Sequence, residues 1–203
     1  MQSLEILLKT EKPSAIFLQE TRLGRAGRIK TPSSVSHYTW YELHRTKAAE
    51  KGKGGGGIAL GVMNYLEPSW ISEGDDDAEA LTVEIWIEGF PIRLICGYGP
   101  QEYDSKDRKD KFWGYIEREV TNTKNIGAGL IIQFDGNLWA GRTIIQDDPN
   151  KQNQNGKIFE SFLQKNSHLN VVNALSICEG KITLRTCIKN IIKESILDFC
   201  YCV

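Results

Sequence analysis

The sequence has no apolar run near the ~20 residues that a membrane-spanning helix needs, so we expect no membrane partner. Its first 14 residues, MQSLEILLKTEKPS, also lack the long apolar stretch and the small-residue cleavage site of a signal peptide. We therefore expect a protein that is not secreted.

The sequence also lacks the cysteine spacing of a zinc site. Its 5 cysteines are an odd number and include no CxxC pair, which argues against structural zinc. We predict reduced thiols in an intracellular protein, cytoplasmic or nuclear. The cysteines are Cys96, Cys178, Cys187, Cys200 and Cys202.

Several common catalytic patterns are missing. The chain has only 3 histidines, His37, His44 and His168, and no Ser-His-Asp or Cys-His arrangement in a known order. The glycine-rich stretch GKGGGG (52–57) is not followed by GK[ST], so it predicts a flexible lead-in to a strand rather than a phosphate-binding loop. The stretch GDDDAE (74–79) lacks the alternating spacing of a calcium loop and predicts an exposed acidic turn.

The charge is nearly balanced overall and uneven along the chain. The net charge of −1 excludes a generic polyanion binder. Residues 21–53 nevertheless carry 8 Lys and Arg against 2 Glu, and residues 67–88 carry 8 acidic residues without Lys or Arg. Two interpretations stay open: a pair of solvated loops, or a basic patch on an enzyme that binds and releases a phosphate-bearing substrate.

What the sequence does contain is a pattern of many short strands with interspersed helices. The hydrophobic share of 40% is enough for a sizeable core. Residues 81–99 predict a hairpin with its turn at Gly89, because apolar residues alternate on both sides. Residues 105–120 and 155–166 predict helices, the second with Asn155 as N-cap, and a further helix ends before Pro13. Further strands are expected at 15–19, 37–44, 57–62, 130–134, 169–173, 181–186 and 195–202. Together they predict an α/β domain of two packed sheets flanked by helices.

Apolar strands end in polar residues at several places. LIIQFDGN (130–137) leads into Asp135 and Asn137, AIFLQET (15–21) into Glu20, and LICGYGPQ (94–101) into Tyr98. SILDF (195–199) carries Asp198 within its strand. If these ends meet, carboxylates, a phenol and an amide converge, and such an oxygen-rich site suits a hard cation such as Mg²⁺. A cation beside a carboxylate base can hydrolyse a phosphate ester, although a turn-capping role explains each residue taken alone.

The motifs LQET, GYGPQ, FDGNLWAG and SILDF, in this order, resemble the endonuclease/exonuclease/phosphatase family. The resemblance is strongest to the endonuclease domains of non-LTR retrotransposons, which are similar to apurinic-site endonucleases. It covers the chain from about residue 4 to residue 203 and implies a four-layer αββα sandwich of two mixed sheets. It also implies Mg²⁺-dependent hydrolysis of a phosphodiester, with Mn²⁺ as a substitute and DNA as the partner.

The resemblance assigns a role to each strand-end residue. It implies that Glu20 binds the metal, that Tyr98 contacts the scissile phosphate and that Asp135 orients or deprotonates the attacking water. Asn137 would position the nucleophile and stabilise the transition state, and Asp198 would orient a catalytic histidine. Trp139 and Arg142, in the next loop, are candidates for nucleic-acid contacts, with core packing and a solvated Arg as equal alternatives.

The chain also departs from the family pattern. The family opens with a strand of the type WNxxG and closes with a Ser-Asp-His stretch, and the sequence contains neither. We therefore expect one domain over residues 1–203 that is trimmed at both ends. The leading functional hypothesis is nicking of DNA in a retrotransposon context. The alternatives are a catalytically inactive remnant or DNA-binding module of the same fold, and a phosphatase of the same family.

Overall fold

The computed structural model describes residues 2–22, 29, 35–44, 56–75, 77–144, 146, 151–172, 184–188, 191–195 and 198–202. At residues 2–3 and beyond residue 172 only the backbone is described. All but Arg22 of the basic residues in 21–53 lie outside these ranges, so the predicted basic patch is not tested. The helices are α1 (Gln2–Thr10), α2 (Lys106–Asn125) and α3 (Gln154–Lys165), with a short 3-10 helix over Asn64–Leu66. The strands are β1 (Ala15–Leu18), β2 (Tyr38–Leu43), β3 (Ile58–Met63), β4 (Ser69–Glu73), β5 (Ala80–Ile87), β6 (Phe90–Tyr98), β7 (Gly129–Asp135), β8 (Asn170–Val171), β9 (Leu184–Ile188), β10 (Ile191–Ser195) and β11 (Asp198–Cys202).

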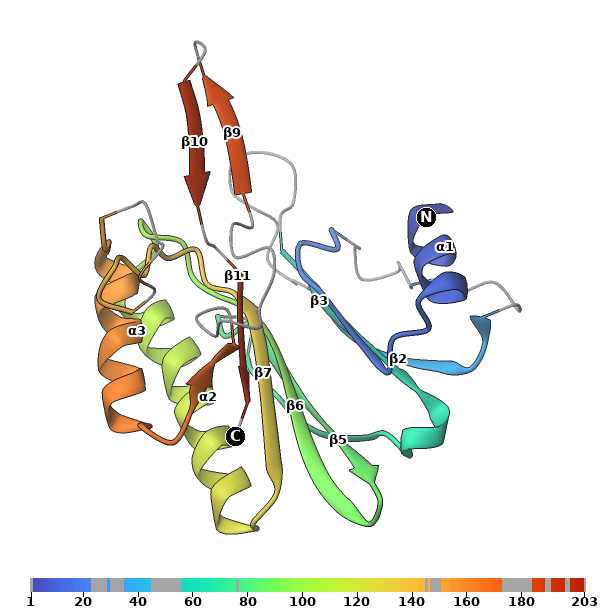
Figure 1. The fold of residues 1–203 in the computed structure, drawn as a ribbon. Coiled ribbons are helices and arrows are strands. Elements are labelled where there is room, and N and C mark those ends of the chain that lie inside the picture. Colours follow the sequence, from blue (N-terminus) through green and yellow to red (C-terminus); the bar gives the residue numbers. More distant parts are fainter. Residues whose placement is uncertain are drawn as a thin grey trace.

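The strands form two main sheets that pack face to face. The larger sheet has the order β4-β5-β6-β7-β11-β8, and the smaller has the order β1-β3-β2. All described pairs are antiparallel except β6 with β7, which is parallel and makes the larger sheet mixed. Helices α2 and α3 cover the outer face of the larger sheet, and α1 lies beyond the smaller sheet (Figure 1). The predicted α/β sandwich is confirmed.

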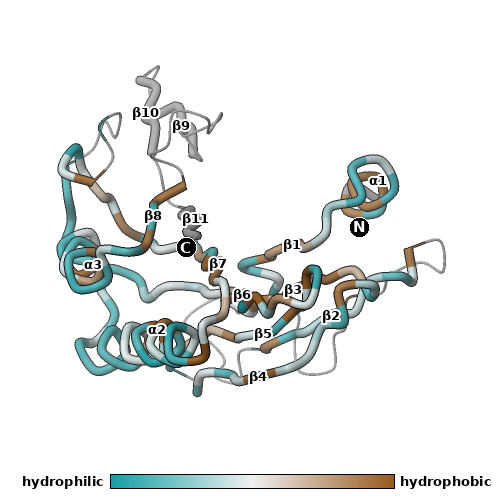
Figure 2. Tube along the Cα trace, turned by 60° about the horizontal axis from the view of Figure 1, so that its bottom comes forward, coloured by the Kyte–Doolittle hydropathy of each residue, from teal (hydrophilic) through white to brown (hydrophobic). Residues whose placement is uncertain are grey.

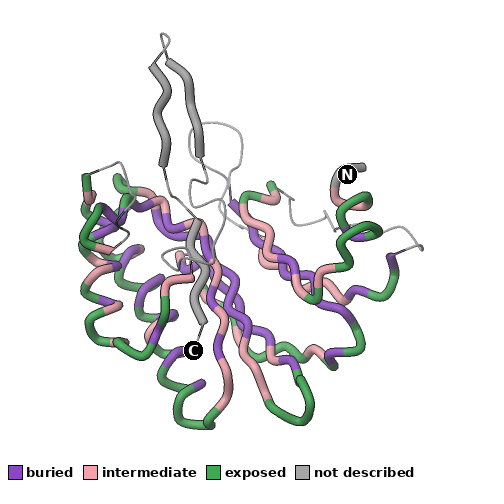
Figure 3. The backbone as a smooth tube through the Cα atoms, in the orientation of Figure 1, coloured by how far each residue is buried: buried purple, intermediate pink, exposed green. Residues whose placement is uncertain are grey.

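The core between the sheets comes from the period of 2 along each strand. Leu81 and Val83 of β5 and Leu94 and Cys96 of β6 point inward and meet Leu60 of β3. The intervening residues point to the other face, where the helices cover them. Hydrophobic segments therefore lie mainly in the central strands, and buried residues concentrate there and on the inner sides of α2 and α3 (Figures 2 and 3).

A second core of aromatic rings fills the space between the larger sheet and its helices. Phe134 of β7 is fully buried and packs edge-on against Phe112 and Trp113 of α2 and Phe159 of α3. Edge-to-face pairs of this kind contribute more than their buried area alone. Because Phe134 directly precedes Asp135, this cluster holds the end of β7 in place.

The helix ends follow capping rules, with one correction to the sequence prediction. Helix α2 begins after Ser105, whose hydroxyl accepts from the Arg108 N–H at 3.2 Å, and it extends five residues beyond the predicted end at residue 120. Helix α3 begins after Asn153, whose side chain accepts from the Gly156 N–H at 2.8 Å. Asn155 is therefore not the N-cap that we predicted. It lies inside the first turn, 1% exposed, because its amide is used for a contact between loops.

The hairpin β5–β6 and strand β7 agree with the predicted ranges to within one residue, whereas β4 was not predicted. Strand β4 is mostly exposed at the edge of the larger sheet, so it lacks a regular apolar alternation. No helix in the described ranges has both the length and the apolar composition needed to cross a membrane.

Cys96 is a free, buried thiol between the two sheets, as the prediction of reduced thiols requires at that position. Its Sγ lies 3.8 Å from the Ala59 carbonyl oxygen and 4.0 Å from that of Leu18. Burial raises the pKa of the Cys96 thiol from 9.0 to about 12. The thiol therefore stays neutral in the folded chain over a pH range in which the unfolded chain ionises it.

We expect Cys96 to resist alkylation in the folded protein. At pH 9 the raised pKa leaves its thiolate fraction about three orders of magnitude below that of an ordinary thiol. Since the thiolate is the form that reacts, alkylation should be correspondingly slow. The raised pKa also means that this group's contribution to stability is present below pH 9.0 and is lost as the pH rises toward about 12. Iodoacetamide labelling followed by peptide mass spectrometry should show modification of Cys96 only in denaturant. Rapid labelling of the native chain would contradict the burial.

Candidate active site

The predicted strand ends meet at one edge of the larger sheet. In the parallel pair β6–β7, Tyr98 is the register partner of Asp135. In the antiparallel pair β7–β11, Asp135 is the partner of Asp198, which begins β11. Three residues that are far apart in the sequence thus occupy one row across neighbouring strands. The side chain of Asp198 lies outside the described residues, so its predicted role is not tested.

Tyr98 and Asp135 also share a face of the sheet. Leu94, Cys96 and Tyr98 alternate on the face that meets the smaller sheet. In β7 the side chain of Phe134 packs against the helices, so that of Asp135 points to the opposite face. Residue Glu20 follows β1 of the smaller sheet, and the Tyr98 hydroxyl donates to its Oε1 at 2.7 Å. The site therefore lies where the two packed sheets end together.

Glu20 combines an exposed carboxylate with an unusual backbone. Its φ of +50° lies in the left-handed region, which a glutamate rarely adopts and which the surrounding structure must hold. The hydrogen bond from Tyr98, together with that from Arg22 at 3.2 Å, lowers the pKa of Glu20 below its ordinary value. The carboxylate is therefore ionised at neutral pH and faces solvent.

Tyr98 is the buried centre of the site, with 6% of its surface exposed. Burial raises the pKa of its phenol, and the hydrogen bond to Glu20 and the charges of Glu20 and Asp135 raise that pKa further. The hydroxyl thus stays protonated and can act as a hydrogen-bond donor over the whole physiological range. It also accepts from the Gln101 side chain at 2.9 Å.

Asp135 and Asn137 form a tight turn at the end of β7. The Asp135 carboxylate accepts from the Asn137 backbone N–H at 3.0 Å, and Asn137 has a φ of +46°. The Asn137 side-chain amide donates to the Gly99 carbonyl oxygen at 2.8 Å, and Gly99 donates from its N–H to the Asp135 carbonyl oxygen at 2.7 Å. A Cβ at Gly99 would lie 3.0 Å from that same oxygen, so glycine allows the two strand ends to approach this closely.

Structural comparison identifies solved structures with the same fold. The endonuclease domain of TRAS1, a telomere-specific non-LTR retrotransposon, superposes with a TM-score of 0.60 at 16% identity, over 100% of this chain and 78% of that one. The AP endonuclease LMAP from Leishmania major gives 0.68 at 16% identity, over 99% and 73%. The 3'-5' exonuclease NExo from Neisseria meningitidis gives 0.65 at 12% identity, over 99% and 80%. The chain has the endonuclease/exonuclease/phosphatase fold. No protein-family model matches the sequence, and no curated protein matches it.

Within this endonuclease/exonuclease/phosphatase fold, the described carboxylates suit a cation that the protein binds through only one or two side chains. Among the residues described, no group of three or more His, Cys, Asp or Glu is arranged to hold a metal ion. Mg²⁺ does not need such a group, because it keeps several waters and is bound through one or two carboxylates together with substrate phosphates. The exposed, ionised Glu20 fits this role.

The remaining predicted residues lie around the edge of this site. Trp139 is 43% exposed and is held through its backbone N–H, which donates to Asn153 at 3.1 Å. Arg142 is exposed in the following turn. Their contacts with nucleic acid stay a prediction. Of the three histidines, His37 and His168 are exposed and His44 lies 3.3 Å from Glu42.

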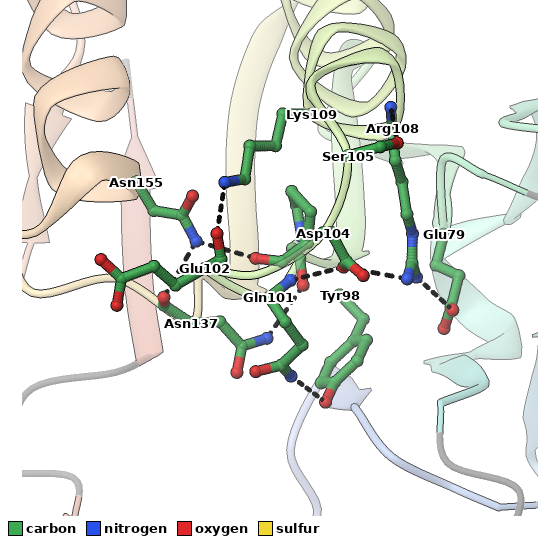
Figure 4. A network of polar contacts seen from close by, with 12 residues as sticks. Glu79, Tyr98, Gln101, Glu102, Asp104, Ser105, Arg108, Lys109, Asn137 and Asn155 are labelled. Atoms are coloured by element: carbon green, nitrogen blue, oxygen red, sulfur yellow. Dashed lines mark hydrogen bonds and ion pairs between the residues drawn. The ribbon is translucent and has the colours of Figure 1, made fainter. Parts of the chain in front are cut away.

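Sequence reasoning missed several residues that join the strand ends to each other. Asn155 donates from its side chain to the Pro100 carbonyl oxygen at 2.8 Å and to that of Asn137 at 3.0 Å, so α3 ties both loops together. Gln101, Asp104, Glu79 and Arg108 form a second network beside them (Figure 4). Gln101 ends the motif GYGPQ, and Glu79 ends the stretch GDDDAE, where we expected an exposed turn but where Glu79 is buried. No motif signals Asn155, Asp104 or Arg108, because their contacts follow from packing between distant segments.

Proposed function

We propose that the chain hydrolyses phosphodiester bonds, with Mg²⁺ as the cofactor and Mn²⁺ as a substitute, and that it nicks DNA in a retrotransposon-type context. The observation that carries the proposal is the hydrogen bond of 2.7 Å between Tyr98 and Glu20, beside Asp135 in the register partner position. This set joins an ionised carboxylate, a protonated phenol and a second carboxylate at one edge of two sheets.

Each residue has a distinct task in this proposal. The Asp135 carboxylate takes a proton from water as the water oxygen attacks phosphorus and the ester P–O bond breaks. The Asn137 amide donates to a phosphate oxygen, where negative charge develops, and the Tyr98 hydroxyl keeps its one proton on the Glu20 carboxylate beside it. Glu20 would hold the cation. When bound, the cation offsets charge on the phosphate and on the leaving oxygen.

The substrate class rests on the structural neighbours and on charge. The structural neighbours include an AP endonuclease and the endonuclease domain of a retrotransposon. The 8 basic residues of 21–53 supply positive charge of the kind that binds a phosphate backbone. An intracellular location, cytoplasmic or nuclear, stays a prediction from the sequence.

A supercoiled-plasmid assay tests the proposal. We expect conversion of supercoiled to open-circular DNA with Mg²⁺ or Mn²⁺, and loss of that conversion when EDTA removes the cation. Boiled protein in the same buffer controls for contaminating metal chemistry. Nicking that continues in excess EDTA would exclude the proposed role of the cation.

The second candidate is a non-catalytic remnant or DNA-binding module of the same fold. It is favoured by one observation, namely that the sequence contains no Ser-Asp-His stretch whose histidine Asp198 could orient. It predicts DNA binding that weakens with salt, without any turnover. A filter-binding or gel-shift titration at two salt concentrations, run beside the plasmid assay, separates the two. Release of inorganic phosphate from a phosphomonoester, without nicking, would instead indicate a phosphatase.

A further inference from the structure

A buried ion pair, Glu79 with Arg108, lies beside the candidate active site. Neither partner is one of the strand-end residues Tyr98, Asp135 and Asp198. Glu79, which precedes β5, is 3% exposed, and its Oε1 accepts from Arg108 Nη2 at 3.1 Å. Arg108 lies in the first turn of α2, with 13% of its side chain exposed. Removing two charges from water is costly, so a pair buried to this degree calls for further bonds that fix its geometry. Both partners have such bonds, and they lead to Glu20 by two routes.

The first route runs through side chains. Arg108 also donates from Nη1 to Asp104 Oδ2 at 2.9 Å, and that same oxygen accepts from the Gln101 backbone N–H at 2.7 Å. Gln101 in turn donates from its side chain to the Tyr98 hydroxyl, which donates to Glu20. Figure 4 shows Arg108, Asp104, Gln101 and Tyr98 in this succession. The Gln101 amide therefore orients the lone pairs of the phenol, which leaves its proton directed at Glu20.

The second route runs through the backbone. Glu79 Oε2 accepts from the Gly57 N–H at 3.0 Å, and the Gly57 carbonyl oxygen accepts from the Thr21 N–H at 3.0 Å. Gly57 has a φ of +84°, and a Cβ there would lie 2.7 Å from Thr21 Oγ1, so this contact needs glycine. Thr21 directly follows Glu20, whose left-handed backbone needs support of this kind. The end of the glycine-rich stretch is thus buried and bonded, which corrects the expected flexible lead-in at Gly57.

A third contact joins the two routes. The Glu79 carbonyl oxygen accepts from the Tyr98 backbone N–H at 2.8 Å. Glu79 therefore contacts the backbone of Tyr98 and, through Gly57, the segment that carries Glu20. The contacts close into a ring that spans the ends of both sheets.

We propose that Glu79 and Arg108 are positioning residues that set Glu20 and the Tyr98 hydroxyl in their reactive arrangement. The expected effect on catalysis rests on the proposed function. The ring itself is independent of that function, because it is a property of the folded chain. Neither Glu79 nor Arg108 has to touch the substrate.

The main variant is Glu79→Gln, which keeps the size of the side chain and removes its charge. A glutamine amide has one acceptor oxygen in place of two, so it loses the hydrogen bond either from the Gly57 N–H or from Arg108. We expect kcat for plasmid nicking to fall about 10–100-fold, as for other groups that orient a metal ligand. We expect KM to change less than about threefold, because binding of DNA does not use the ring.

Glu119→Gln is the matched control. Glu119 lies on the same helix α2 and is equally buried, at 3% exposed, near Arg118 of α2 and Arg93 of β6. It is eleven residues beyond Arg108, or about 16 Å along the helix axis. We expect Glu119→Gln to change thermal stability and to leave kcat within about twofold of the wild type, because it acts on no group of the ring.

Amide hydrogen exchange gives a readout that does not depend on activity. In Glu79→Gln the N–H groups of Thr21 and Gln101 should exchange at least about tenfold faster, whereas in Glu119→Gln they should not. The Met63 N–H, which donates to the Ser14 carbonyl oxygen at 3.0 Å, serves as an internal reference outside the ring. If Glu79→Gln fails to fold, Arg108→Lys replaces it, because a lysine keeps the charge but lacks the planar fork that bridges two carboxylates.

Faster exchange at Thr21 and Gln101 together with the selective loss of kcat would support the proposal. Unchanged exchange, or faster exchange without loss of kcat, would overturn it. If the wild type itself does not nick DNA, the proposed function fails, and the exchange data alone then decide whether the ring holds the Glu20 segment. In a Tyr98→Phe background, Glu79→Gln should cost less in kcat than it does in the wild type, because Tyr98→Phe has already removed the side-chain route and only the backbone route through Gly57 is left to lose. Full additivity would argue against the side-chain route.

Discussion

Replacing Asp135 by asparagine is expected to lower the initial rate of DNA nicking by about 10²–10⁴-fold while the chain stays folded. Asparagine has nearly the same shape, and its carbonyl oxygen can still accept from the Asn137 N–H that Asp135 binds at 3.0 Å. The turn at the end of β7 is therefore preserved. What is lost is the negative charge and the ability to take a proton from water.

Asp110→Asn provides the matched control for this change. Asp110 is an exposed carboxylate on α2 whose partner is Lys106 four residues earlier. Its loss is expected to change stability by less than about 0.5 kcal/mol, as for other surface pairs, and to leave the nicking rate unchanged. Both variants are compared with the wild type by plasmid nicking under saturating Mg²⁺, with circular dichroism as the check of folding. A rate for Asp135→Asn within about threefold of the wild type would exclude Asp135 as the base.

The second large effect is expected on stability, from replacing Phe134 by alanine. Phe134 is fully buried and contacts three aromatic rings at centroid distances of 5.7 to 6.3 Å. Truncating such a side chain removes its burial and leaves a cavity between β7 and the two helices. The free energy of unfolding should fall by about 3–5 kcal/mol, measured by urea denaturation.

Phe90→Ala is the corresponding control, because Phe90 belongs to the neighbouring strand β6 but is 50% exposed near the hairpin turn. We expect its effect to stay below about 1 kcal/mol, since less apolar surface is lost and no closed cavity forms. If the two variants lose similar amounts of stability, the aromatic cluster does not hold β7 as the structure indicates. Phe134→Ala should also reduce nicking, because Phe134 fixes the strand end that carries Asp135.

The local elements of the fold could be predicted because their signals are short in range. The hairpin β5–β6 follows from alternation of apolar residues around Gly89, and β7 follows from the apolar run before Asp135. The two helices after residue 100 follow from their apolar stripes. Strand β4 was missed because an exposed edge strand has no buried face to produce such a pattern.

The candidate site shows the same division between short-range and long-range information. The ordered motifs directed attention to Glu20, Tyr98 and Asp135, and the structure brings these three residues together. The N-cap of α3 was assigned to Asn155 instead of Asn153, although both asparagines satisfy the local rule. What distinguishes them is a contact from Asn155 to Pro100, 55 residues earlier in the chain.

The sequence by itself determined where the strands end and which polar side chains those ends carry, because strand periodicity and motif order are written in consecutive residues. Only the tertiary structure decided that Glu79 and Arg108 connect the two sheets, and that Gly57 supports the segment after Glu20. These contacts join residues that are 22 to 36 positions apart. Their geometry depends on the parallel register of β6 and β7 and on how the sheets pack, which no local pattern encodes.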